Sequence, residues 1–209
     1  RPREGGDGVD LIAEPWGIGA GTYQLGHFPK AWSEWNGAFR DTIRKDMNLL
    51  DVVDTTPRQV LFAVAGSPDH FATGRPPSAS INFLVAHDGF TLRDLYSCNG
   101  KNNTQPWPYG PSDGGENNNL SWNYGGDPVR QRQAARTGMA LLLLSAGVPM
   151  ITGGDELYRT LQCNNNAYNL DSPANWLDWS LPQTFPEYAT FVREMLHFRG
   201  AHPALRPKQ

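Results

Sequence analysis

VDLIAEPW, residues 9–16, is a short apolar run that ends on a carboxylate, Glu14, followed at once by Pro15 and Trp16. A second stretch, SINFLVAHDGF at residues 80–90, ends in the same way on His87 and Asp88. Short strands that are apolar throughout are typical of a parallel sheet covered by helices. We therefore predict buried strands at residues 9–14 and 81–86, each followed directly by polar side chains.

The remainder of the chain alternates helical patterns with one more short apolar run. A third strand is expected at VPMIT, residues 148–152, just after a helix that starts at the Asp127 N-cap with Pro128 in its first turn. Residues 15–34 read as a loop rich in glycine, proline and aromatics. The predicted helices are residues 35–50, 127–146 and a last one that ends at Gly200, with TFPE at 184–187 as its capping box. Residues 58–72 fit a helix or a strand, and the helix is favoured.

The loops that follow the predicted strands are long, and the loops that precede them are short. Residues 97–126 form one such loop, and a second begins at residue 153. This asymmetry is typical of a (β/α) barrel, in which the loops at the carboxyl ends of the strands build the active site. Glu14 and Asp88 both lie where a strand meets its following loop.

Composition excludes several classes of function. The chain has 209 residues, a formal net charge of −3 and no basic run, so nothing favours a nucleic-acid partner. No apolar run reaches the roughly 18 residues that a membrane span needs. The five histidines lack the spacing of metal ligands, and neither a GxSxG nor a phosphate-binding motif is present, so we expect no metal and no cofactor. The polar start is no signal peptide, and without an initial methionine the chain is expected to be a fragment.

Two carboxylates at one end of a barrel suit acid–base work on a sugar bond. The apolar neighbours of Glu14 favour its protonated form, as a general acid requires, whereas Asp88 has a more polar setting. The alternative is structural: Glu14 is then a surface carboxylate at a strand end, and Asp88 caps the turn at residues 89–94.

At these residues the sequence resembles the alpha-amylase superfamily of glycoside hydrolases, and within it the isoamylases, which debranch glycogen and amylopectin. The resemblance rests on LIAEPWGIGAGTYQLGHFPKAWSEWNGAFRD, on INFLVAHDGFTLRDLYSCNGKNN, and on MITGGDELYRTLQCNNNAYNLD with NWLDW. It implies that Glu14 is the proton donor, that Asp88 stabilises the oxocarbenium-like state, and that His87 hydrogen-bonds the same sugar. Trp16 and Asn166 are candidates for further contacts with an α-glucan. The alternative for Trp16 is a role in packing alone.

The resemblance also shows what this sequence lacks. The family carries its nucleophile on an Asp after the fourth strand, in a motif like GFRFD, and that motif is missing; FRD at residues 39–41 belongs to the helix after Trp35. The chain therefore resembles the second half of a (β/α)8 TIM barrel, strands five to eight with their helices and long βα loops. Residues 1–209 would be one partial catalytic domain with no complete second domain, inactive alone, whose partner is the missing N-terminal half. The alternative is a non-catalytic carbohydrate-binding or structural half-barrel.

The two cysteines, Cys98 and Cys163, open the two longest loops, which follow strands placed seventh and eighth by the resemblance. Composition leaves a disulfide and two free thiols about equally open, but the isoamylase-like motifs favour the disulfide. Such a bond favours an oxidising compartment, so the protein is expected to be secreted or periplasmic. A cytoplasmic or plastid enzyme with two buried thiols is the alternative.

Overall fold

The computed structural model describes residues 9–17, 19–49, 55–71 and 74–207. Four short strands form one parallel sheet in chain order: β1 (Leu11–Ala13), β2 (Trp32–Asn36), β3 (Ser80–Asn82) and β4 (Val148–Pro149). The predicted α/β fold with a parallel sheet is thus confirmed. Each predicted strand is present but shorter than expected, because only part of each apolar run pairs with a neighbour.

The strand β2 lies partly in residues 15–34, which the sequence pattern predicts as a loop, and partly in the predicted helix that starts at Trp35, so the prediction is wrong here. The face of β2 that points toward the helices carries polar residues, so the usual alternation of apolar and polar positions is hidden. Glu34 on this face is fully buried and forms an ion pair with Arg75, while Gly26 N–H donates to the other Glu34 oxygen at 2.8 Å. Asn36 ends the strand and caps the next helix by accepting from Phe39 N–H at 2.8 Å.

Six α-helices were found in the described part of the chain: α1 (Gly37–Asn48), α2 (Pro57–Val64), α3 (Leu92–Leu95), α4 (Pro128–Leu144), α5 (Leu181–Thr184) and α6 (Pro186–Ala201). The Asp127 carboxylate caps α4 by accepting from Val129 N–H at 2.8 Å, as predicted. The predicted TFPE capping box is wrong, because Phe185 stands at the N-cap of α6 without a side-chain hydrogen bond. A capping box starts α2 instead, between Thr56 and Gln59.

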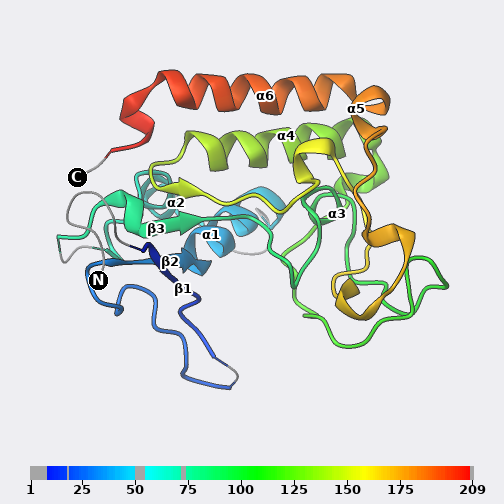
Figure 1. Cartoon of the computed structure of the whole chain (residues 1–209), viewed down its shortest axis with the longest axis horizontal. Coiled ribbons are helices and arrows are strands. Elements are labelled where there is room, and N and C mark those ends of the chain that lie inside the picture. The colour runs from blue at the N-terminus through cyan, green and yellow to red at the C-terminus, as the bar shows by residue number, and fades with distance from the viewer. Residues whose placement is uncertain (1–8, 18, 50–54, 72–73, 208–209) are drawn as a thin grey trace.

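The helices form layers on one side of the sheet. In Figure 1, α6 and α4 run side by side along the top of the molecule, with the strands and α1 below them. The core between these layers is apolar and includes Phe39 and Ile43 of α1, Met139 and Leu143 of α4, and Tyr188 of α6. Arg199 of α6 donates to three backbone carbonyls at 2.5–2.8 Å. One belongs to Leu143 in the last turn of α4, and the others belong to Ser145 and Gly147 just after it.

The opposite side of the sheet, called the open side below, is only partly covered by the described residues: Ile81 at its centre is buried. Ile12 pairs with Ser33, and Trp35 pairs with Ile81, which pairs with Val148. Ser33 and Trp35 are two residues apart on β2, so all five side chains point to the same side of the sheet. Ile12 is 53% exposed and Val148 is 41% exposed. Both are apolar residues of a sheet, and such residues are ordinarily covered.

The two long loops, residues 97–126 and residues 153–180, lie at one end of the molecule, on the right of Figure 1. The disulfide expected from the resemblance, Cys98–Cys163, is present and joins them. Buried asparagines reinforce the junction, since Asn165 Nδ2 donates to Asn119 Oδ1 at 2.9 Å and Asn103 Nδ2 donates to Asn165 Oδ1 at 3.0 Å.

Within the described residues, no helix has the length and hydropathy that a bilayer span requires.

Candidate active site

The candidate catalytic carboxylates follow β1 and β3, which are separated in the sheet by β2 alone. Parallel strands present their carboxyl ends at one edge, so Glu14 and the pair His87–Asp88 extend from the same edge of the sheet. All three side chains are exposed. The apolar enclosure that the sequence analysis expected around Glu14 is therefore not formed by the described residues.

A line of aromatic rings connects the two strand ends on the open side of the sheet. Trp16 lies 6.3 Å from Trp35 between ring centroids and 6.2 Å from Tyr23, on which it stacks. Between ring centroids, Trp35 lies 5.6 Å from Phe83, with the two rings tilted. Its distance to the His87 ring is 5.9 Å, and these two rings meet edge to face. This aromatic line contacts the His87 ring and covers part of Trp16, which thus has the packing role considered from sequence while the rest of its ring stays accessible.

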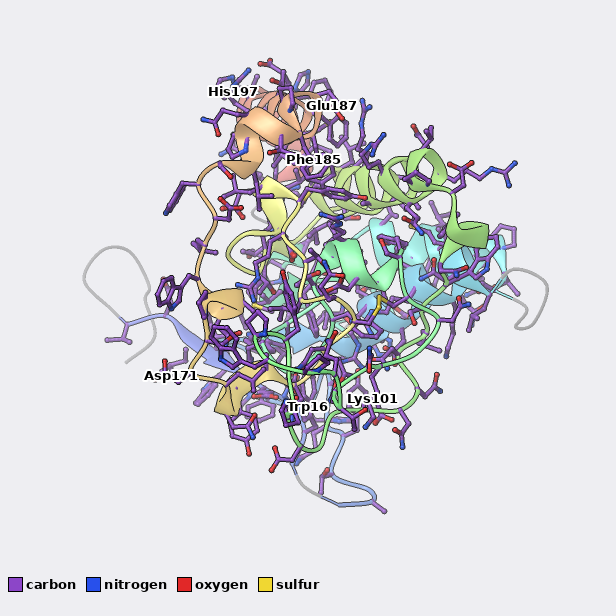
Figure 2. The ribbon with its side chains drawn as sticks, turned by 90° about the vertical axis from the view of Figure 1, so that its right-hand side faces the viewer. Trp16, Lys101, Asp171, Phe185, Glu187 and His197 are labelled. Atoms are coloured by element: carbon purple, nitrogen blue, oxygen red, sulfur yellow. A yellow bond between two sulfur atoms is a disulfide. The ribbon has the colours of Figure 1, made fainter. Side chains whose placement is uncertain are left out.

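Figure 2 looks onto the end of the molecule where the long loops lie, with a yellow bond marking the disulfide. In this view Trp16, Lys101 and Asp171 occupy the lower half, while Glu187 and His197 of α6 lie at the top. Trp16, one of the candidate site residues, thus lies on the part of the molecule remote from α6.

Asp88 lines a cavity of about 530 Å³. Three cationic residues of α1 line it too, Arg40, Arg44 and Lys45, together with Glu116 of the long loop. Burial lowers the pKa of Arg44 to about 10, which leaves its guanidinium charged at neutral pH. Hydrogen bonds from Asn118 and Asn117 N–H lower the pKa of Glu116, so this wall of the cavity is anionic. The result is a polar chamber of a size suited to small ligands.

The α1 residues were missed from sequence. FRD at residues 39–41 was assigned to a helix and given no function, although Arg40, Asp41 and Arg44 repeat at helical spacing along one face. That face lines the cavity beside Asp88. Arg44 is held there by donating to Leu84 O at 2.7 Å and to Asn119 O at 3.1 Å. The spacing was a usable signal, but only the packing of α1 against the loop showed its importance.

The structural alternative for Asp88 finds no support in the hydrogen bonds of the turn that follows it. Thr91 caps α3 by accepting from Asp94 N–H at 3.1 Å, and the Asp155 carboxylate accepts from Leu92 N–H at 2.8 Å. The N–H groups of Leu92 and Asp94 at the start of α3 are thus satisfied by other residues, and Asp88 lines the cavity.

Asn166, the weaker candidate for sugar contact, bridges the two long loops. Its Nδ2 donates to Asp113 O at 2.6 Å, and its backbone N–H donates to Asn164 Oδ1 at 2.8 Å. These bonds explain its fixed place, and a role in sugar binding stays a prediction. Among the described residues, no cluster of three His, Cys, Asp or Glu side chains is arranged to hold a metal.

Comparison with known proteins extends the resemblance. The chain is 61% identical over 208 residues to an isoamylase of Flavobacterium sp., a match that covers 99% of this chain and 27% of the relative. It is 40% identical over 208 residues to a glycogen debranching enzyme of Klebsiella pneumoniae, covering 94% and 30%. Among solved structures, a type I pullulanase of Bacillus subtilis in complex with maltose matches with a TM-score of 0.66 and 26% identity, covering 95% and 27%.

No family model matches the chain. The chain spans about a quarter of the length of the curated relatives it matches, so the comparisons speak for that segment. Within it the agreement extends over nearly every residue of this chain. The resemblance drawn from the sequence is therefore confirmed, and these 209 residues are similar throughout to one segment of the isoamylase-type debranching enzymes.

Proposed function

We propose that this chain is the second half of a (β/α)8 barrel, strands five to eight with their helices, from a retaining glycoside hydrolase that cleaves α-1,6 branches of glycogen and amylopectin. The observation that carries the proposal is the placement of Glu14 and His87–Asp88 at one edge of a parallel sheet, joined by the aromatic line on its open side. The open side then faces the other half of the barrel, which covers Ile12 and Val148.

In this proposal Glu14 protonates the oxygen of the leaving sugar, and Asp88 binds the sugar at the cleaved bond as positive charge develops on its ring. His87, steadied by Trp35, hydrogen-bonds the same sugar. Trp16 stacks on a pyranose face, and Asn166 supplies an amide to a hydroxyl. The nucleophile comes from the half of the barrel that this chain does not carry, so the chain alone is inactive.

The names of the relatives support an α-glucan as the substrate. The Flavobacterium relative is an isoamylase, and the Bacillus subtilis structure holds maltose. The disulfide between the loops favours an oxidising compartment, so we propose a secreted or periplasmic protein, with a cytoplasmic or plastid location as the alternative.

A chimera tests the proposal. This chain replaces the matching segment of the Flavobacterium isoamylase, and release of linear chains from amylopectin is measured. The chimera is expected to debranch, and Glu14→Gln is expected to lower turnover about 10²–10⁴-fold, because the leaving oxygen then departs unprotonated.

The matched control is Asp10→Asn, an exposed carboxylate just before β1, which is expected to leave turnover unchanged. Unchanged turnover in Glu14→Gln would remove Glu14 from the mechanism. A folded chimera that binds amylopectin without cleaving it would favour the non-catalytic half-barrel. Debranching by the isolated 209-residue chain would show that no second half is needed.

A further inference from the structure

A second cavity, separate from the one beside Asp88, opens between the two long loops. Its volume is about 220 Å³, and no described residue lines both cavities. The walls combine the rings of Tyr109 and Trp176 with Arg159, Thr160 and Asp178. This volume lies below the roughly 300–1,000 Å³ typical of drug-sized ligands, and it suits one ring of a longer molecule.

Trp176 is 69% exposed although it stands in a firmly held segment. The short helical turn Pro173–Asn175 directly precedes it. Ser172 Oγ donates to Pro108 O at 2.6 Å, and Asn175 Nδ2 donates to Leu170 O at 2.6 Å and to Ala167 O at 3.0 Å. The Ser172 bond ties the segment to the facing loop and the Asn175 bonds hold it to its own loop, so the large apolar indole is presented to solvent by ordered backbone.

The charged residues of the cavity offer one donor group and one acceptor group. The Arg159 guanidinium has five N–H donors, and among the described residues its one hydrogen bond is from Nη1 to Gly153 O at 3.3 Å. Hydrogen bonds from the Ser180 hydroxyl and N–H lower the pKa of Asp178, which keeps this carboxylate ionised as an acceptor. Donor and acceptor beside an aromatic face are what a pyranose requires, because it has an apolar C–H face and a rim of hydroxyls.

We propose that this cavity binds a single glucose unit of an α-1,4-glucan chain, as an anchoring site apart from Glu14 and Asp88. Trp176 stacks on the sugar ring, and Arg159 and Asp178 hydrogen-bond neighbouring hydroxyls. An anionic ligand is disfavoured, because Asp178 would repel it. The choice of an α-glucan over another sugar rests on the proposed function. The inference that the cavity binds a sugar ring rests on its shape, its indole and its charge pair, and is independent of that function.

Titration of the full chain with maltohexaose tests the proposal by NMR. The indole N–H signals of the seven tryptophans are followed, and the signal that disappears in Trp176→Ala identifies Trp176. This signal is expected to shift saturably with a dissociation constant in the millimolar range. Trp176→Ala is expected to weaken binding at this site about tenfold, equivalent to about 1.4 kcal/mol.

Trp179→Ala is the matched control, because Trp179 lies on the same loop and is 70% exposed but does not line the cavity. It is expected to leave the affinity within about twofold, a change of about 0.4 kcal/mol. Arg159→Lys, which keeps the charge and loses the planar fork, is expected to weaken binding severalfold.

Repeating the titration in Asp88→Asn separates this site from the candidate active site, since the Trp176 shift is expected to persist there. Absence of a Trp176 shift, or equal weakening by Trp179→Ala, would overturn the anchoring site. An equal response to cellohexaose would overturn its selectivity for α-linked glucose. If the catalytic proposal failed in the chimera, a saturable Trp176 shift would still stand by itself.

Discussion

Two regions of the molecule are ordered by different kinds of contact. Between α1, α4 and α6 most of the buried side chains are apolar, and Ile43, Met139 and Leu143 are fully enclosed. Where the loops 97–126 and 153–180 meet, buried asparagines hydrogen-bond across the junction and one disulfide joins the two loops. Asp94, for example, accepts from Leu161 N–H at 2.7 Å and from Thr160 Oγ1 at 2.5 Å, which ties α3 to the second loop.

The difference shows how polar contacts and a covalent bond can hold long loops around a polar site, where apolar burial is smaller than between the helices. Hydrogen bonds and a covalent bond hold the backbone, so the surfaces that face the cavities stay free for charged and aromatic groups. Rigid loops of this kind keep binding groups in place at a lower entropic cost when a ligand arrives.

The largest expected effect comes from cutting the covalent link between the loops. Cys163→Ser opens a bridge between residues 65 apart in sequence, which in the chain-entropy model lowers the free energy of unfolding by about 4 kcal/mol. Urea denaturation measures the loss. Hydrogen exchange should show the loops losing protection before α4 and α6 do.

The double variant Cys98→Ser/Cys163→Ser is the control for this cut. It should match the single variant, because both lack the same one bond. Simultaneous loss of protection in α4 and in the loops would contradict the separation of the two regions.

Leu143→Ala breaks the helical layer instead. Leu143 is fully buried, and removing its branched end should cost about 3 kcal/mol through lost transfer energy and the cavity left behind. Its neighbour Leu144, 37% exposed on the same helix, supplies the control, and Leu144→Ala should cost well under half as much. Equal losses in the two variants would mean that apolar burial does not govern this layer.

Asn165→Ala tests the polar junction of the loops. The variant removes side-chain bonds to Asn103, Asn119 and Glu116 and leaves buried amides without partners, at a cost of about 2 kcal/mol. Asn169 is exposed, with one long hydrogen bond to Asp113, so Asn169→Ala should have little effect on the urea midpoint. A small loss in Asn165→Ala would mean that the disulfide alone orders the loops.

The smallest effect is a dependence on pH. Burial raises the pKa of Asp155 to about 7, and its neighbours Glu156 and Asp94 add to the rise, while Leu92 N–H and Arg159 oppose it. In the unfolded chain this pKa is about 3.9. The native state therefore holds the proton more tightly, and the stability this provides is complete below the unfolded pKa and is lost as pH rises through the folded one.

From about pH 6 to about pH 7.5 the loss attributable to Asp155 should be about 1 kcal/mol. Asp155→Asn keeps an acceptor for Leu92 N–H and should flatten this part of the stability profile, measured by urea denaturation at each pH. Asp171→Asn, at an exposed position, should leave the profile as it is. A flat profile in the parent chain would show that Asp155 is already ionised throughout this range.

Local features of the sequence determined the start of α4, the parallel α/β class and the two motifs that end on Glu14 and Asp88. The Asp127–Pro128 pair needs only its own helix turn to act, because a cap bonds N–H groups two and three residues away. An apolar run that ends on a carboxylate is likewise a local pattern, since a few neighbouring residues are enough to predict a strand followed by a polar side chain. The resemblance added the pairing of Cys98 with Cys163.

Tertiary structure alone decided the features that depend on residues far apart in the chain. The strand β2 is possible because Arg75, 41 residues away, neutralises Glu34 on its buried face. Arg199 satisfies carbonyls at the end of α4 from more than 50 residues away. Arg44 is held at the wall of the cavity beside Asp88 by its hydrogen bond to Asn119 O of the long loop. In each case a buried charge is stable only because backbone or side-chain groups far away in the sequence form an ion pair or hydrogen bonds with it. No local pattern in the sequence predicts such a contact.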